Sequence, residues 1–215
     1  MLINEKDQAV IQERFQELEN KVTLVFFETT LDCEYCATTK QLVEELSALS
    51  DKLDFVVYNL HADDQIAAKY RVTRAPALVL LDDKHKDYGI KFYGIPSGYE
   101  FSTLLEDILM VSTGKTTLSK DTIDALQKLS DPVHLQVFVT PTCPYCPNAV
   151  RLAHMAAFVS DQVTGDMVEA SEFPELSQKY TVYGVPKTIV NEVGGMEGAV
   201  PEKQFLEEVL KAVMV

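Results

Sequence analysis

The tetrapeptide Cys143-Pro144-Tyr145-Cys146 repeats a pattern that stands 110 residues earlier in the chain as Cys33-Glu34-Tyr35-Cys36. In both halves a proline follows the first cysteine at a distance of 43 residues, and these prolines are Pro76 and Pro186. Self-similarity of this kind is typical of repeated architecture. The sequence therefore predicts two fused copies of one fold.

Each copy is expected to have the same order of elements, because apolar residues recur with the same spacing in both. In the first copy we expect helices at residues 5–20, 36–50, 64–70 and 100–111, and strands at 22–28, 53–60, 77–81 and 88–93. In the second copy we expect helices at 122–129, 145–159, 174–180 and 201–213, strands at 133–140 and 167–169, and a hairpin turning at Gly194-Gly195. This order predicts an α/β fold, with a mixed β-sheet flanked by helices in each unit.

The hairpin and the linker refine this organisation. Beyond the two prolines the offset between the copies falls to 104, since Gly94 matches Gly198, and this predicts a hairpin six residues shorter in the second copy. The polar stretch 112–117 has no periodicity and marks the boundary between the copies. We therefore predict units at residues 1–116 and 117–215, each with one cysteine pair.

The composition is that of an ordinary globular protein, with 47% apolar and 24% charged residues, which excludes disorder for most of the chain. Acidic residues outnumber basic ones by 33 to 19, so the formal net charge is −14. A chain this negative repels phosphate backbones and anionic lipids, so we expect neither nucleic acid nor membrane as a partner. Residues 1–7 show no cationic start before an apolar run, so we expect no secretory signal and a cytoplasmic location.

The four cysteines form two Cys-x-x-Cys pairs, each expected after a buried strand and at the start of a helix. A helix N-terminus stabilises a thiolate through its unpaired N–H groups and its dipole, and we expect the first cysteine of each pair there. The second cysteine would lie about one turn further along, where it can resolve a mixed disulfide. A bridge that closes so short a loop stabilises the fold little, so it is better suited to being made and broken.

Metal binding and loss of function are the alternatives for these cysteines. Two pairs can hold zinc or an iron–sulfur cluster, but 106 residues separate the pairs here, and each pair has its own strand and helix. One of the two pairs could also be vestigial. We expect two redox-active disulfides, Cys33–Cys36 and Cys143–Cys146, and no metal or other cofactor.

The two prolines at matched spacing belong to Ala75-Pro76 and Val185-Pro186, and each precedes an apolar strand. A proline at such a position can simply begin a strand in the trans form. The matched distance from the cysteines favours cis peptide bonds at both positions, as found where a tight local geometry is needed.

Four further passages of the chain are specific, namely residues 70–76, 92–96, 138–147 and 165–170. With the cysteine pairs they make the whole chain resemble the protein disulfide oxidoreductases of heat-loving prokaryotes, which consist of tandem thioredoxin-fold units. The second pair is also similar to the glutaredoxin signature. The resemblance implies dithiol–disulfide exchange on protein substrates, by reduction, oxidation or isomerisation, and hence a role in cell redox homeostasis. It further implies a thioredoxin-reductase-like flavoprotein that recharges the sites.

The same resemblance gives roles to individual residues. Cys33 and Cys143 are expected to attack the substrate, and Cys36 and Cys146 to resolve the mixed disulfide. A substrate strand would add its backbone to the loops at Ala75, Pro76, Val185 and Pro186. Tyr35 and Tyr145 are expected to line the substrate grooves, although either ring could instead pack against its helix.

Two glutamates are candidate proton acceptors for a resolving thiol. Glu45 lies on the helix that follows Cys36, between two apolar positions, so its side chain could be partly buried. Glu169 lies in the specific passage 165–170. The resemblance implies that buried acids serve in this way, whereas the alternative for each residue is a solvated glutamate.

Charge distinguishes the two sites. Asp32 and Glu34 flank Cys33, and their negative charges disfavour a thiolate, whereas neutral residues flank Cys143. We therefore expect the pKa of Cys143 to lie below that of Cys33. A stabilised reduced form makes a stronger oxidant, so the second site is expected to have the higher reduction potential.

Three other functions are alternatives. An electron relay would be similar to the tandem thioredoxin-fold segment of flavin-dependent peroxide-reducing systems. Such a segment usually keeps one cysteine pair and continues into a flavin domain. Here both pairs are intact and the sequence ends at Val215. A glutathione-dependent glutaredoxin is disfavoured because Gly184 stands where glutaredoxins tend to carry threonine. A non-catalytic scaffold on the same fold would keep its activity after replacement of all four cysteines by serine.

Overall fold

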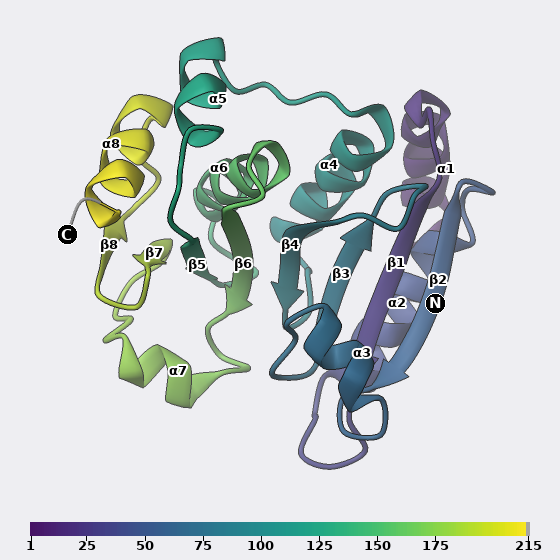
Figure 1. Ribbon diagram of the computed structural model, residues 1–215. Helices are drawn as coiled ribbons and strands as arrows, with labels where there is room; N and C mark the ends of the chain where they lie inside the picture. Colours follow the sequence, from purple (N-terminus) through teal and green to yellow (C-terminus); the bar gives the residue numbers. More distant parts are fainter. Residues whose placement is uncertain (214–215) are drawn as a thin grey trace. The chain divides into compact units, whose positions relative to one another are not determined.

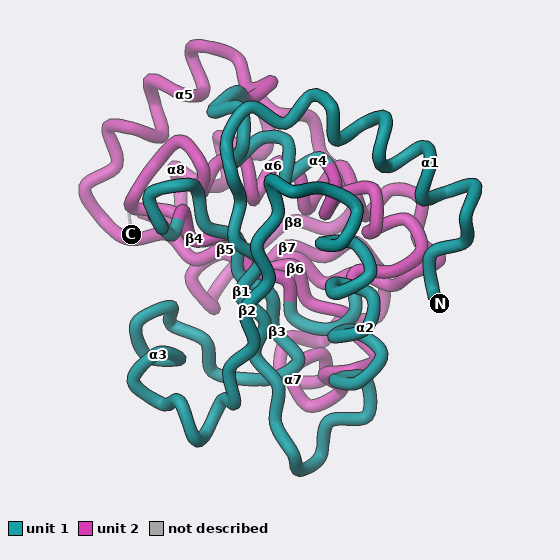
Figure 2. The backbone as a smooth tube through the Cα atoms, turned by 90° about the vertical axis from the view of Figure 1, so that its right-hand side faces the viewer, with its two compact units in different colours: residues 1–87, 93–95, 106–115 teal, residues 88–92, 96–105, 116–215 magenta. Residues whose placement is uncertain are grey.

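A computed structural model describes residues 1–213, and residues 214 and 215, the last two of the predicted C-terminal unit, lie outside the described part. The chain divides into two compact units, which are coloured separately in Figure 2. Unit 1 contains residues 1–87, 93–95 and 106–115, and unit 2 contains residues 88–92, 96–105 and the chain from residue 116 onward. The boundary after residue 116 stays a prediction.

Unit 1 alternates helices and strands (Figure 1). Its elements are α1 (Glu5–Arg14), the 3-10 turn η1 (Phe15–Glu17), β1 (Val22–Glu28), α2 (Cys36–Ser47), β2 (Leu53–Asn59), α3 (Asp64–Lys69) and β3 (Ala77–Leu81). Strand β1 lies between the other two, parallel to β2 and antiparallel to β3. Strand β4 (Asp87–Tyr93) and helix α4 (Glu100–Thr113) contribute residues to both units.

Unit 2 repeats this order, with α5 in the place of α1 (Figure 1). Its elements are α5 (Lys120–Leu126), β5 (Val133–Val139), α6 (Cys146–Val159), β6 (Val163–Glu169), α7 (Pro174–Lys179), β7 (Lys187–Val190), β8 (Gly194–Glu197) and α8 (Glu202–Ala212). The strand order in unit 2 is β4-β6-β5-β7-β8. Strand β5 pairs parallel to β6 and antiparallel to β7, which pairs antiparallel to β8. The predicted α/β class, with mixed sheets flanked by helices, is confirmed.

The strands form the centre of each core. Strand β1 is buried except at its last residue, β3 is buried throughout, and β5 is buried except at His134. Such apolar, β-branched and aromatic runs suit strands that are covered on both faces. Helix α2 buries Leu42, Val43 and Leu46, which lie at helical spacing and form its apolar stripe.

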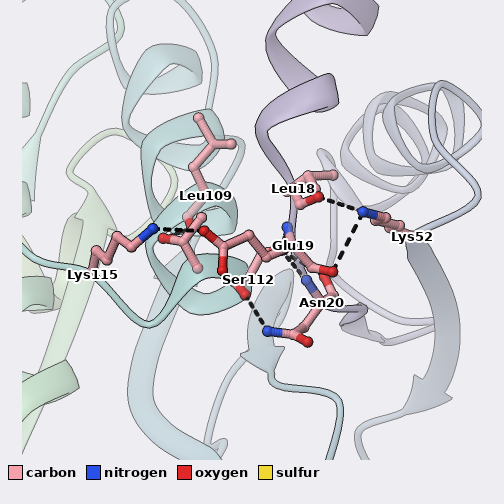
Figure 3. Close-up of polar contacts among 8 residues, drawn as sticks. Leu18, Glu19, Asn20, Lys52, Leu109, Ser112 and Lys115 are labelled. Atoms are coloured by element: carbon pink, nitrogen blue, oxygen red, sulfur yellow. Dashed lines mark hydrogen bonds and ion pairs between the residues drawn. The ribbon is translucent and has the colours of Figure 1, made fainter.

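A buried serine joins distant parts of unit 1 (Figure 3). The hydroxyl oxygen of Ser112, near the end of α4, accepts hydrogen bonds from the backbone N–H groups of Glu19 and Asn20, each at 3.0 Å. The amide group of Asn20 donates in return to the carbonyl oxygen of Ser112 at 2.9 Å. Lys52 donates to the carbonyl oxygens of Leu18 and Glu19. These bonds satisfy the backbone where η1 passes into β1, and they hold residues 106–115 in unit 1.

The two halves differ in their hairpins as the sequence predicts. The N–H of Gly94 donates to the carbonyl oxygen of Pro76, and the N–H of Gly198 donates to that of Pro186. Strand β8 has 4 residues, whereas its counterpart β4 has 7. The shorter hairpin therefore accounts for the change of offset.

Several elements depart from prediction. Helix α5 is Lys120–Leu126 and not 122–129, and the second hairpin turns at residues 191–193, because Gly194 and Gly195 begin β8. Helix α1 ends at Arg14 and continues as the 3-10 turn η1, so the first helix is shorter than the expected 5–20. Strand β6 begins at Val163, four residues before the expected start. Gly165 and Asp166 have low strand propensity and conceal this part of the strand, but pairing with β5 overrides that preference.

Among residues 1–213, no helix combines the length and the apolar character needed to cross a membrane.

Candidate active sites

The first cysteine pair lies between the end of β1 and the start of α2. Cys33 and Cys36 form a disulfide, with their Cα atoms 5.4 Å apart. Cys36 is buried, whereas Cys33 is partly exposed. The helix begins at Cys36 and not at Cys33, so it is the second cysteine that occupies the helix N-terminus; Cys33 lies in the turn before it.

The second pair has the same arrangement after β5. Cys143 and Cys146 form a disulfide with a Cα–Cα distance of 5.5 Å, and helix α6 begins at Cys146. Cys143 keeps 8% of its surface exposed and Cys146 keeps none. In both pairs the first cysteine is thus the more exposed residue, as expected of an attacking thiol, and the second is more deeply buried.

Both predicted cis prolines are confirmed, since the peptide bonds Ala75–Pro76 and Val185–Pro186 are cis. The second of these loops lies directly at the cysteines, where Sγ of Cys143 is 3.7 Å from the carbonyl oxygen of Val185. Pro76 and Pro186 are buried, and the residue before each is partly exposed. A substrate backbone approaching Cys143 would therefore meet the Val185 main chain.

Charged groups lie near the first pair. Glu28 ends β1, and its carboxylate accepts hydrogen bonds from the Lys40 ammonium at 3.0 and 3.2 Å. Lys40 follows Cys36 by four residues on α2, so both lie on one face of that helix. Arg74, beside the cis proline, stacks over the Tyr93 ring at 5.4 Å. Sequence inspection missed the ion pair, although a strand-end acid and a helix cation were visible.

The expectation for Glu45 is corrected by its contacts. Its Oε2 accepts hydrogen bonds from the backbone N–H groups of Leu2 at 2.7 Å and Ile3 at 3.0 Å, and its Oε1 accepts one from Gln41. These bonds lower the pKa of Glu45 to about 2, the bond from Ile3 having the largest effect. A carboxylate so stabilised is a poor proton acceptor, and it lies more than two helical turns from Cys36. Glu45 anchors the N-terminal segment, and these contacts do not favour its expected role as a proton acceptor.

This anchoring predicts an acid-dependent stability. In the folded protein Glu45 keeps its charge down to about pH 2, whereas the unfolded chain protonates it near the ordinary value of 4.5. Its stabilising contribution is therefore complete above pH 4.5 and is lost as the pH falls towards 2. We expect Glu45→Gln to remove this part of the pH dependence, in urea unfolding measured between pH 2 and pH 6.

The exposed neighbour Glu44, replaced as Glu44→Gln, is the matched control, and its curve should follow the unmodified protein. An unchanged slope for Glu45→Gln would show that the N-terminal hydrogen bonds do not stabilise the fold.

Glu169 lies at the end of β6, paired with Val139 at the end of β5, on the edge of the sheet from which the Cys143 loop leaves. It is 4% exposed, and its Oε2 accepts the N–H of Glu172 at 2.7 Å. Its Oε1 is buried and has no hydrogen-bond partner among the described residues. At the equivalent position of unit 1, Asn59 likewise accepts N–H groups of the following turn, but it has no carboxylate. Glu169 therefore remains a candidate proton acceptor.

Tyrosines are exposed around the second pair. Tyr145 is 67% exposed between the two cysteines, and Tyr35, its counterpart at the first pair, is 39% exposed. Tyr183, next to the second cis-proline loop, is 95% exposed. The first two were expected to line grooves, whereas Tyr183 was missed because nothing in its local sequence marks it.

A buried charged cluster in unit 2 also escaped sequence inspection. Asp166 on β6 accepts a hydrogen bond at 2.6 Å from the His134 ring, and the ammonium of Lys91 lies 3.7 Å from its other oxygen. Burial raises the pKa of Asp166, but His134 and Lys91 together bring it below the ordinary value. The cluster balances its own charges and holds β4, β5 and β6 together. Within residues 1–213, no three His, Cys, Asp or Glu side chains gather as metal ligands would.

Comparison with known proteins agrees with this geometry. A thioredoxin-like domain model matches residues 11–109, and a thioredoxin domain model matches residues 133–211. A protein disulfide oxidoreductase from Aeropyrum pernix superposes with a TM-score of 0.92 at 29% identity, covering 100% of this chain and 95% of that one. The chain thus carries two thioredoxin-like domains in tandem, and over its whole length it is similar to a disulfide oxidoreductase of that architecture. With two oxidised Cys-x-x-Cys pairs, its chemistry is dithiol–disulfide exchange.

The chain is also similar to an alkyl hydroperoxide reductase component of about its own length and to parts of longer curated proteins. The alkyl hydroperoxide reductase component AhpF from Enterococcus faecalis superposes with a TM-score of 0.90 at 26% identity, covering 97% of this chain and 100% of that one. The chain is 24% identical over 213 residues to an NADH dehydrogenase of Bacillus subtilis, and 30% identical over 106 residues to the corresponding alkyl hydroperoxide reductase component of Staphylococcus aureus. These alignments cover 98% and 49% of this chain but 38% and 20% of the curated relatives. The oxidoreductase thus spans well under half of their length.

Proposed function

We propose that the protein exchanges disulfides with protein substrates at two sites, through attack by Cys33 and Cys143 and resolution by Cys36 and Cys146. The attacking thiolate bonds to one substrate sulfur, and the other substrate sulfur leaves and takes up a proton. The resolving thiol, once deprotonated, then attacks the mixed disulfide and releases the second substrate thiol. Two electrons thereby pass from the protein dithiol to the substrate, and the reverse sequence oxidises a substrate dithiol.

The observation that carries these roles is the difference in exposure within each pair. Cys33 is partly exposed against 6% for Cys36, and Cys143 is 8% exposed against none for Cys146, so a protein disulfide would meet the first cysteine of each pair before the second. We further propose that an extended substrate segment lies along Tyr35, Ala75 and Pro76 at the first site, and along Tyr145, Val185 and Pro186 at the second. At the second site Glu169, buried with one free oxygen, would accept the proton of the resolving thiol.

The partners follow from this exchange. Each turnover that reduces a substrate leaves a disulfide in the protein, so a reductase must return two electrons. We propose a thioredoxin-reductase-like flavoprotein in that role, and a cytoplasmic setting as the sequence suggests. The redox-active disulfides supply the chemistry themselves.

Reduction of insulin by dithiothreitol tests the proposal. We expect the protein to accelerate the reaction and the variant with all four cysteines replaced by serine to lose the acceleration. The double variants Cys33→Ser/Cys36→Ser and Cys143→Ser/Cys146→Ser then divide the activity between the sites. Activity in the quadruple variant would overturn the proposal in favour of a scaffold.

A relay between a reductase and a peroxide-reducing protein is the second candidate function. It is favoured by the alignment of nearly the whole chain, 98%, with part of an NADH dehydrogenase, and by the similarity to the alkyl hydroperoxide reductase component AhpF. A relay should reduce the disulfide form of a two-cysteine peroxidase at least about tenfold faster than insulin at equal concentration, since docking to one partner would be optimised. Equal rates would favour the general oxidoreductase.

A further inference from the structure

We propose that Tyr99, Tyr145 and Tyr183 form an aromatic rim around the second redox site, and that this rim selects protein segments with an aromatic or large aliphatic side chain next to the disulfide. The inference rests on the proposed function, and it names the substrate class of one site. All three tyrosines belong to unit 2, and they are 52%, 67% and 95% exposed.

Tyr99 comes to this site through a closely packed loop. The backbone N–H of Tyr99 donates to the carbonyl oxygen of Pro141 at 3.1 Å, two residues before Cys143. The preceding residue, Gly98, has a φ of +59°, and a Cβ atom there would lie 2.1 Å from the same oxygen. Only glycine permits this approach, so the loop that carries Tyr99 is held against the segment that carries Cys143.

The other two rings flank the reactive sulfur along the chain. Tyr145 lies between the two cysteines. Tyr183 stands two residues before Val185, whose carbonyl oxygen is 3.7 Å from Sγ of Cys143. Exposed tyrosines offer large apolar contact area at little conformational cost, which is why they are enriched at binding surfaces.

The first site lacks this arrangement, which makes the rim specific to the second. The repeat places Thr73 at the position of Tyr183. The repeat counterpart of Tyr99 is Lys203, which belongs to unit 2. Only Tyr35 stands as a counterpart, beside the exposed charges of Asp32 and Glu34. In a chain of net charge −14, an uncharged aromatic rim favours apolar segments.

The test compares two cyclic peptides closed by one disulfide, identical except for Phe or Ser next to one cysteine. The background is Cys33→Ser/Cys36→Ser, so that only the second site works, and thiol release is followed with dithiothreitol as reductant. We expect kcat/KM to favour the Phe peptide by about tenfold, and the ratio to fall towards one in Tyr99→Ala and in Tyr183→Ala, since truncating a central tyrosine commonly has an effect of that size. Tyr99→Phe, which keeps the ring, should retain the preference.

Gly98→Ala and Lys203→Ala are the matched controls. Gly98→Ala should displace the loop that carries Tyr99 while leaving the ring intact, so the ratio of kcat/KM for the Phe and Ser peptides should fall as in Tyr99→Ala. Lys203→Ala changes only the repeat counterpart of Tyr99, so the ratio should stay as it is in the background protein. The proposal would be wrong if kcat/KM were nearly equal for the Phe and Ser peptides in the background protein. It would also be wrong if the preference for the Phe peptide persisted in both Tyr99→Ala and Tyr183→Ala. Failure to reduce either peptide would instead overturn the proposed function.

Discussion

Replacement of Cys146 by serine should leave the protein joined covalently to its substrate. Cys143 would still attack, but the mixed disulfide would lack the buried thiol that resolves it, whose Cα atom lies 5.5 Å away. We expect turnover at the second site to fall about a thousandfold, as for other catalytic groups that act as a unit. In the Cys33→Ser/Cys36→Ser background, intact mass after incubation with insulin should show the adduct, which dithiothreitol should release.

Because Cys143 attacks and Cys146 resolves, the two single variants should give different results. Cys143→Ser, the matched variant, removes the accessible sulfur and should give neither adduct nor turnover. An adduct formed by Cys143→Ser and not by Cys146→Ser would show that the roles are reversed. Such a result would require the helix start at Cys146 to open, because that side chain is fully buried.

Gly165→Ala should destabilise unit 2 by about 2–3 kcal/mol, because it forces an extra methyl group into a close-packed contact. A Cβ atom at Gly165 would lie 2.7 Å from the carbonyl oxygen of Ala153 and 3.1 Å from the ring of His154. Both neighbours belong to α6, so β6 and the helix that begins at Cys146 would have to separate. The free energy of unfolding in urea measures the effect.

Gly184→Ala is the matched control, since its Cβ atom would meet nothing within 4 Å and its φ is not in the left-handed region. We expect little change in its free energy of unfolding. A Gly165→Ala variant as stable as this control would show that α6 and β6 can move apart cheaply. The positions of Cys146 and Glu169, at the ends of these two elements, would then be less constrained than the packing indicates.

Strong local patterns made most of the fold predictable. Strands β1 and β3 were placed at their observed bounds because apolar residues dominate both, broken in β1 only by Thr23 and the final Glu28. The first half of β6 was missed because Gly165 and Asp166 do not favour strands on their own. The reason for each of them lies outside the strand: Gly165 permits the approach of α6, and Asp166 binds His134 and Lys91.

Some features of the candidate sites were predictable from the sequence and others were not. The cysteine pairs and the cis prolines were predictable because the same spacing between them occurs in both halves and can be recognised without knowledge of the tertiary structure. Glu45 is partly buried as its helical position predicts, but that position does not show that the backbone N–H groups of Leu2 and Ile3 bind its carboxylate.

The sequence by itself determined the duplicated α/β architecture, the two disulfides and the class of chemistry, because these depend on spacing within one element or between repeats. The tertiary structure alone decided which cysteine of each pair is accessible, that Glu169 keeps a free buried oxygen, and that Tyr99 lies beside Pro141. These features depend on contacts between segments distant in the chain, and close packing, which local sequence does not encode, determines where such segments meet.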